Sequence, residues 1–222
     1  AGARIADYLG LVDKKERVLG LVSLSSEEPI ALGTRQGVVK RVAPGGYPNR
    51  PDFEIIALKP GDEVVGVGQG SDADELVFVA SDAQLLHFSA AQVRPQGAAA
   101  GGMAGINLAS GATVLFFGAV DPADAVVVTI STPTETLPGA DPGRGKVSHF
   151  SEFPGKGRAT GGVRSHAFLK GESALAIAWA GPAPALAVSA DGAARTLPDA
   201  GAKRDASGTP LDAVVASIGR PL

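Results

Sequence analysis

The chain has 222 residues and a formal net charge of −3, with 45% hydrophobic and 19% charged residues. Its 30 glycines and 16 prolines are too many for a helical bundle, and their spread between apolar runs argues against a collagen-like or disordered chain. The absence of cysteine excludes a disulfide framework, a thiolate zinc site and a cysteine nucleophile. Taken over the whole chain, the negative charge argues against nucleic acid as a partner.

The first residues, Ala1 to Asp7, lack the apolar stretch of a signal peptide, and the chain does not start with methionine. No apolar run reaches the roughly 18–20 residues that a membrane-spanning helix needs. We therefore expect a piece of a longer protein that has no membrane partner.

Short runs of Val, Ile, Leu and Phe, separated by Gly, Pro, Asp and Ser, predict strands and turns along the chain. A strand, a tight turn and a second strand are expected at residues 30–41, 76–88, 125–150 and 185–197, the third copy being interrupted by a Pro-rich stretch at 131–142. A second half-motif follows, in which a short strand, a leucine and a Gly-containing turn precede another strand. Its copies lie at 55–65, 105–115 and 163–175.

The two half-motifs recur in the same order, which predicts a repeat of about four strands, the size of a propeller blade. An ordinary β-sandwich with chance similarity is the alternative. A single domain over residues 1–222 is expected, with the second half of a blade at 1–27 and successive blades at about 28–70, 75–120, 125–181 and 184–219.

Several local features of the repeat point to a family. The turn Thr34–Gly37 precedes a strand that ends in Lys40 and Arg41, and a Leu-x-x-Gly-Asp turn follows at Leu58–Asp62. Residues 153–164 form a Gly-rich basic loop, with a neutral counterpart at 96–106. Together these resemble the C-terminal domain of the A subunit of bacterial type IIA topoisomerases, gyrase and topoisomerase IV, over nearly the whole chain. The resemblance implies an all-β fold, a β-pinwheel, which is a propeller-like disc of about four-stranded blades that exchange strands.

The resemblance also implies a function. The basic rim of such a disc would bind and bend duplex DNA, largely independently of sequence, and present it to an ATP-dependent strand-passage enzyme. No catalytic residue and no cofactor is expected in this domain, because ATP and Mg would bind in other parts of the parent enzyme. The implied partners are duplex DNA, the ATPase B subunit, and the N-terminal part of the same A subunit. The implied location is the bacterial cytoplasm, at the nucleoid.

Charge is segregated along the repeat. Residues 31–50 hold four basic residues and no acid, and residues 144–170 hold six bases against one acid. Residues 51–91 hold eight acids against one base, and residues 113–143 hold four acids and no base. Because phosphate contacts depend on charge within about 8–10 Å, the basic stretches can bind DNA despite the net negative total.

Most single bases in turns are merely solvated, but their clustering predicts a DNA-binding surface. Scarce aromatic residues, 5% of the chain, argue against base stacking. The candidate DNA-binding residues are Arg35, Lys40, Arg41, Arg50, Arg94, Arg144, Lys146, Lys156, Arg158, Arg164, Arg195, Lys203 and Arg204.

Enzyme and metal motifs are absent from the sequence. Residues 66–70 lack the spacing of a dinucleotide-binding loop. The histidines His87, His149 and His166 follow no metal-ligand spacing, and we expect His87 and His149 to pack at strand ends or at the rim.

Two choices stay open. The Gln-Arg-Arg-Gly-Gly-Lys-Gly box that gyrase A subunits carry for negative supercoiling does not occur here, which favours topoisomerase IV, with decatenation and relaxation, over gyrase. An alternative of another class is a propeller that serves as a protein-interaction module. It would expose aromatic or aliphatic anchors on one face and show no salt-dependent affinity for DNA.

Overall fold

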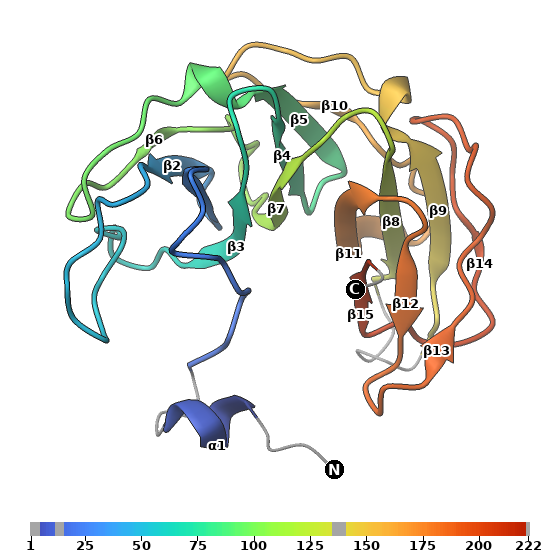
Figure 1. The fold of residues 1–222 in the computed structure, drawn as a ribbon. Helices are drawn as coiled ribbons and strands as arrows, with labels where there is room; N and C mark the ends of the chain where they lie inside the picture. The colour runs from blue at the N-terminus through green and yellow to red at the C-terminus, as the bar shows by residue number, and fades with distance from the viewer. Residues whose placement is uncertain (1–4, 12–15, 135–140, 221–222) are drawn as a thin grey trace.

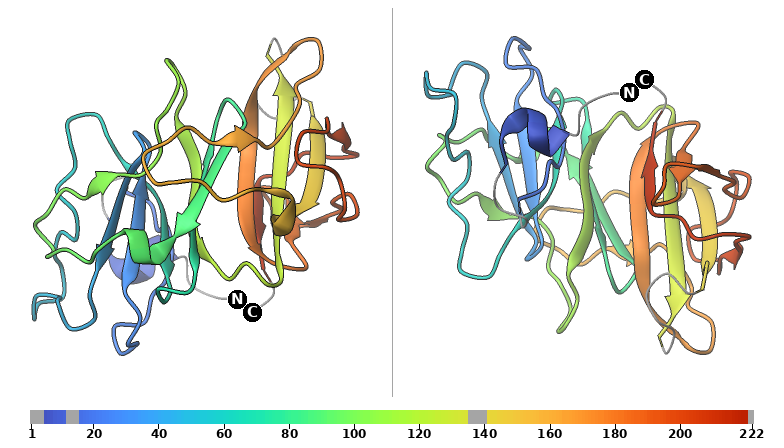
Figure 2. Two further views of the ribbon diagram at one scale, coloured as in Figure 1. Left: turned by 90° about the horizontal axis from the view of Figure 1, so that it is seen from above. Right: turned by 90° about the horizontal axis from the view of Figure 1, so that it is seen from below.

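The computed structural model describes residues 5–11, 16–134 and 141–220. These residues form four antiparallel sheets. The sheets are arranged in an arc around a common centre (Figure 1). Seen from above or below, they lie side by side in chain order (Figure 2). The predicted all-β, propeller-like fold is confirmed.

The first three sheets share one plan, in which the innermost strand is the last of its own segment and the outermost strand comes from the next segment. The first sheet has the order β3 (Val64–Gln69), β1 (Ile30–Thr34), β2 (Val38–Val42) and β6 (Met103–Ala104). In the second, β7 (Val114–Val120), β4 (Glu75–Ala80) and β5 (Gln84–Ser89) are followed by β10 (Val163–Arg164).

The third sheet repeats this plan with β11 (Glu172–Pro182), β8 (Ala125–Pro133), β9 (Arg144–His149) and β14 (Thr209–Pro210). The fourth contains β15 (Ser217–Gly219), β12 (Leu186–Val188) and β13 (Ala194–Arg195). The 3-10 turns η1 (Ala90–Gln92) and η2 (Phe150–Glu152) follow β5 and β9. The outer strands β6, β10 and β14 are the exchanged strands that the pinwheel predicts.

The hydrophobic cores lie between neighbouring sheets. In β4, Leu76 and Phe78 pack toward the first sheet, whereas Val77 and Val79 pack toward the third. A strand covered on both faces needs apolar residues at every position, which explains why the predicted strands read as continuous apolar runs rather than as alternating ones.

Glycines on the inner strands allow close packing of neighbouring sheets. A Cβ on Gly33 would lie 2.1 Å from the Phe117 ring, and one on Gly66 would lie 2.2 Å from the Phe117 carbonyl oxygen. Residues 66–69, which lack the spacing of a nucleotide-binding loop, therefore form a strand whose glycines serve packing against β7.

The N-terminal segment differs from the expected half-blade. Within residues 5–11 and 16–27 the structure has the short helix α1 (Ile5–Leu9) and no strand. The Gln69 side-chain oxygen accepts a hydrogen bond from the Ser23 amide at 3.0 Å, and the Gln69 side-chain N–H donates to the Ser23 carbonyl oxygen at 2.8 Å. One side chain therefore makes the contacts that a paired strand would make with β3. Residues 135–140, inside the expected Pro-rich interruption, lie outside the described residues. The blade boundaries stay a prediction, although three strands of each sheet start within the expected ranges.

Candidate nucleic-acid interface

Three loops cross the outer edge of the arc and carry the exchanged strands. We call them the first, second and third rim loops, residues 94–107, 154–167 and 198–211. Each belongs to one segment of the chain and pairs with the preceding sheet through β6, β10 or β14. In Figure 1 these strands lie on the outside of the arc, away from β3, β7 and β11.

The rim loops are bonded to each other by contacts that recur at equivalent positions. The Asn107 amide donates to the Thr160 carbonyl at 3.0 Å, and the Ala167 amide donates to the Ala206 carbonyl at 3.1 Å. Side chains repeat the pattern, since Arg158 Nη1 donates to the Ala104 carbonyl and Arg204 Nη1 to the Arg164 carbonyl. The three loops therefore form one continuous edge over three sheets.

Six of the thirteen predicted DNA-binding residues gather on this edge, although they come from three segments. We call them the rim cluster. Four have exposed side chains and two, Arg158 and Arg204, are half-buried. None of the six forms an ion pair with a carboxylate of the described residues. The members of the rim cluster are Arg94, Lys156, Arg158, Arg164, Lys203 and Arg204.

Three predicted residues instead have buried side chains, and this differs from the expectation that they contact DNA. Lys40, Arg41 and Lys146 are 0%, 1% and 2% exposed. Their strands β2 and β9 lie inside sheets that are covered by the next rim loop. The cations donate to carbonyl groups of the protein, which leaves them no access to phosphate.

Lys40 and Lys146 occupy equivalent positions, one residue beyond the pairs Val39–Met103 and Gly145–Thr209. Lys40 Nζ donates to the carbonyl oxygens of Ile55, Ala98 and Ala100 at 2.6–2.7 Å. Burial lowers the pKa of Lys40 from its usual value. A cation that satisfies three carbonyl groups of a loop fixes that loop to the sheet.

Lys146 holds the third rim loop in the same way, donating to the carbonyl groups of Lys203 and Arg204. Burial lowers the pKa of Lys146 to about 8. The nearby Asp205 carboxylate opposes this shift, whereas Arg204 adds to it. The buried lysine thus presents two members of the rim cluster by holding their backbone.

Arg41 and His87 form a second pair of equivalent positions. Arg41 Nη1 donates to the Ala90 carbonyl at 2.8 Å and to Asp72 at 2.6 Å. His87, on β5, contacts the Phe153 carbonyl and the Glu75 carboxylate. Sequence reasoning assigned His87 only a packing role. His87 occupies the same position of the repeat as the buried Arg41, and this equivalence could have indicated that His87 bonds to the following loop.

The remaining predicted residues lie outside the rim cluster. Arg35 donates to the Glu63 carboxylate at 2.8 Å, and Arg50 is exposed between β2 and β3. Arg144, half-buried on β9, donates through Nε to the Gly208 carbonyl at 2.9 Å. Arg195 lies on β13 of the fourth sheet and is half-buried.

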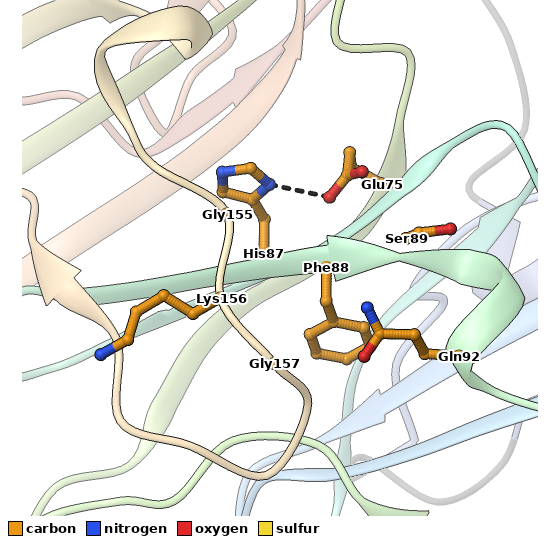
Figure 3. Close-up of a pocket in the computed structure, with 8 residues that line it drawn as sticks. All are labelled: Glu75, His87, Phe88, Ser89, Gln92, Gly155, Lys156 and Gly157. Carbon is orange, nitrogen blue, oxygen red and sulfur yellow. Dashed lines mark hydrogen bonds and ion pairs between the residues drawn. The ribbon is translucent and has the colours of Figure 1, made fainter.

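A pocket of about 390 Å³ lies where the second rim loop passes over β5. Figure 3 shows the Lys156 side chain pointing away from His87 and Glu75, outward from the loop. Ser89 and Gln92 line the far end of the pocket, and the Gln92 side-chain oxygen accepts a bond from the Arg158 amide at 3.3 Å. The loop is therefore held from both ends, and the exposed Lys156 Nζ makes one long hydrogen bond, to the Gly162 carbonyl oxygen at 3.5 Å.

His166, near the end of the second rim loop, is buried against β8 of the third sheet. Its Nε2 accepts a bond from the Gly208 amide at 3.3 Å, so Nδ1 carries the proton and donates to Thr129 at 2.9 Å. Burial, and then the charge of Lys146, lower the pKa of His166 to about 4, which agrees with this neutral form.

The described residues offer little to other kinds of site. No group of three or more His, Cys, Asp or Glu that could hold a metal ion is found among them. No described helix is long and apolar enough to span a membrane.

Comparison with known proteins gives a consistent set of relatives. The family model described as "DNA gyrase C-terminal domain, beta-propeller" matches residues 74–121 and 143–166. The DNA gyrase A protein of Deinococcus deserti is 31% identical over 172 residues, 73% of this chain and 20% of that protein. The DNA gyrase A protein of Escherichia coli is 27% identical over 169 residues, 74% of this chain and 18% of that protein. The chain spans about a fifth of the length of these curated relatives.

Solved structures show the same fold. The C-terminal domain of a DNA topoisomerase IV has a TM-score of 0.79 at 20% identity, with 98% of this chain and 70% of that chain covered. A DNA gyrase A C-terminal domain has a TM-score of 0.76 at 18% identity, with 96% and 73% covered.

Proposed function

Because the chain belongs to the family of C-terminal domains of bacterial type IIA topoisomerase A subunits, we propose that it binds and bends duplex DNA along the rim cluster. The observation that carries the proposal is the continuous edge of three bonded rim loops, on which six bases stand without carboxylate partners among the described residues. The duplex would follow this edge for use by the parent enzyme, in the bacterial cytoplasm at the nucleoid.

The chemistry of the edge favours contact with phosphate groups. Lys156 is flanked by Gly155 and Gly157, and a Cβ at Gly157 would meet no atom within 4 Å, so the backbone that follows this lysine is open to a ligand. Backbone N–H groups beside Lys or Arg can then approach phosphate closely. Contacts of this kind read the shape and deformability of DNA rather than its bases.

The curved edge supports bending. The rim loops follow the arc of the sheets in Figure 1, so a duplex that contacts all three must curve with them. Bending a site of 20–30 base pairs by 40–90° costs on the order of 1–6 kcal/mol, which several phosphate contacts together can offset.

Fluorescence anisotropy with two unrelated duplexes of about 25 base pairs tests the proposal, together with energy transfer between dyes at the duplex ends. We expect similar affinities for both sequences, a steep loss of affinity with salt, and dye ends that come closer on binding. The absence of salt-dependent binding, with no retention on heparin, would instead favour the protein-interaction module.

Within the family, we propose topoisomerase IV rather than gyrase, with decatenation and relaxation as the activity of the parent enzyme. The missing Gln-Arg-Arg-Gly-Gly-Lys-Gly heptad supports this choice, whereas the matches to curated gyrase A proteins favour gyrase. A plasmid assay of the whole enzyme, with its N-terminal part and B subunit, distinguishes them. ATP-dependent negative supercoiling of relaxed DNA would assign the chain to gyrase.

A further inference from the structure

His87 lies between two hydrogen-bond acceptors. Its Nδ1 is 2.8 Å from the Glu75 carboxylate, and its Nε2 is 2.9 Å from the Phe153 carbonyl oxygen. The residue is 8% exposed, and its ring lies against the Phe150 ring with the centroids 4.6 Å apart. The imidazole is thus enclosed between β4 and the chain that enters the second rim loop.

This arrangement determines the proton count of the ring. A carbonyl oxygen can only accept, so Nε2 must carry a proton, and an ionised carboxylate can only accept, so Nδ1 must carry one too. A neutral imidazole has a single N–H and can satisfy one of the two partners. Both contacts are complete only when His87 is an imidazolium. The buried His166 is the opposite case, because its Nε2 accepts from a backbone amide.

The charges around His87 are consistent with a cation. The charged side chains that line its pocket are Glu75 from β4 and Lys156 from the second rim loop. The Lys156 side chain points away from the ring, as Figure 3 shows, whereas Glu75 is bonded to it. Glu152, on the same turn as Phe150, is exposed.

The histidine contacts the loop at several points. The Lys156 amide donates to the His87 carbonyl at 3.1 Å, and a Cβ at Gly155 would lie 3.2 Å from His87 Cε1. The loop therefore lies against the His87 ring and is bonded to the His87 backbone. In the first sheet the equivalent position holds Arg41, a permanent cation that also joins a carboxylate to a carbonyl group after the 3-10 turn.

We propose that His87 is a positioning residue for DNA binding: as an imidazolium it ties Glu75 to the Phe153 carbonyl group and so fixes the second rim loop with Lys156 on the DNA-facing edge. When His87 loses one proton, one of the two contacts is lost and the loop is held less firmly, although its backbone bonds to His87 and to the first rim loop remain. The contribution of Lys156 to DNA binding therefore falls as the pH rises. This part of the inference rests on the proposed function.

The protonation state is tested without DNA. Nitrogen-detected NMR of the histidine rings, recorded from about pH 5.5 to 8.5, reports the protons on each ring nitrogen. We expect two ring protons on His87 where both of its contacts are present, and His166 to stay neutral with its proton on Nδ1. A single proton on His87 throughout this range would overturn the proposal. The proposal would also be overturned if Nδ1 of His87 carried no proton and accepted a hydrogen bond from a protonated Glu75 carboxyl group.

The DNA arm compares His87→Arg and His87→Gln with His149→Gln as the matched loss of an exposed histidine. Between about pH 6 and 8, the salt slope of the wild type and of His149→Gln should fall by up to about 0.9, the share of one phosphate contact. His87→Arg, which copies Arg41, should keep the slope at both pH values, and His87→Gln should show the lower slope at both. Equal pH dependence in all four proteins would overturn the proposal.

The two arms separate this inference from the proposed function. If the wild type binds no duplex at any pH, the proposed function fails, and the NMR result still decides the state of His87. If DNA binds and the His87 ring carries one proton, the proposed function stands and the positioning role of the His87 imidazolium is refuted. Amide exchange at Lys156, whose N–H bonds to His87, shows in each variant whether the loop stays in place.

Discussion

Neutralising the second rim loop is the perturbation that examines the proposed interface most sharply. The triple variant Lys156→Gln, Arg158→Gln and Arg164→Gln removes three bases from one loop that carries no acid between residues 154 and 167. Lys156 and Arg164 are exposed, and Arg158 uses Nη1 for the Ala104 carbonyl while its other N–H groups remain. Three phosphate contacts are therefore the largest number that the loop can lose.

The expected magnitude follows from counterion release. Each phosphate contact contributes about 0.9 to the slope of log affinity against log salt, so the slope should fall by up to about 2.7. Raising salt from about 50 to 200 mM weakens binding roughly 3.5-fold for each contact, so the wild type should lose about 40-fold more affinity over this range than the variant. The loss should be similar for unrelated duplexes, because no base is read.

The assay is anisotropy at several salt concentrations, with thermal unfolding as a check on stability. The matched control is Arg17→Gln, Lys59→Gln and Lys170→Gln, which removes the same charge from exposed residues outside the rim loops. An equal loss of slope in the control would show that the total charge matters rather than this edge. An unchanged slope in the triple variant would refute the assignment of the second rim loop.

Three further predictions concern the scaffold behind the interface. Lys40→Met should lower the free energy of unfolding by about 2 kcal/mol or more, because three carbonyl groups lose their donor; chemical denaturation checks this. Gly162→Ala should lower the melting temperature clearly, since its Cβ would lie 2.5 Å from the Leu85 carbonyl oxygen, whereas Gly161→Ala, which meets no atom within 4 Å, should not. His166 has a pKa of about 4 in the folded protein and of about 6.5 when unfolded, so the unfolded state binds more protons between these values and stability should fall as the pH drops from about 6.5 to 4. Chemical denaturation at both pH values checks this, and His166→Gln should show a smaller decrease; an equal decrease would contradict the assignment of a buried neutral histidine.

Much of the fold could be predicted because local and repeated signals agree. Tight turns such as the one ending at Gly37, which has φ of +84°, mark the hairpins, and the order of the half-motifs marks the repeat. The N-terminal segment could not be predicted in this way. Its apolar residues suggest strands, but β3 meets this segment through the Gln69 side chain rather than through a strand ladder.

The site was predicted in part, and the difference has a physical cause. Lys40 and Lys146 were grouped with the surface bases, because the sequence does not show that a loop from the next segment covers their strands. Each is followed within two residues by a core strand position, Val42 or Val147, whereas the rim base Lys156 lies between glycines. A core residue within two positions therefore marks a cation that binds carbonyl groups inside, whereas Lys156, with a glycine on both sides, stays at the surface.

Site-specific cross-linking to DNA tests the central claim most directly. The chain has no cysteine, so single cysteines can be placed at Arg94, Lys156 and Lys203 on the rim loops and, as controls, at Lys59 and Lys170 in exposed turns. With a photoreactive group on each cysteine and one labelled duplex, we expect cross-links from all three rim positions, at separate places along the same duplex, and none from the controls. Cross-links from Lys59 or Lys170 equal to those from the rim positions would contradict a DNA path along the rim cluster.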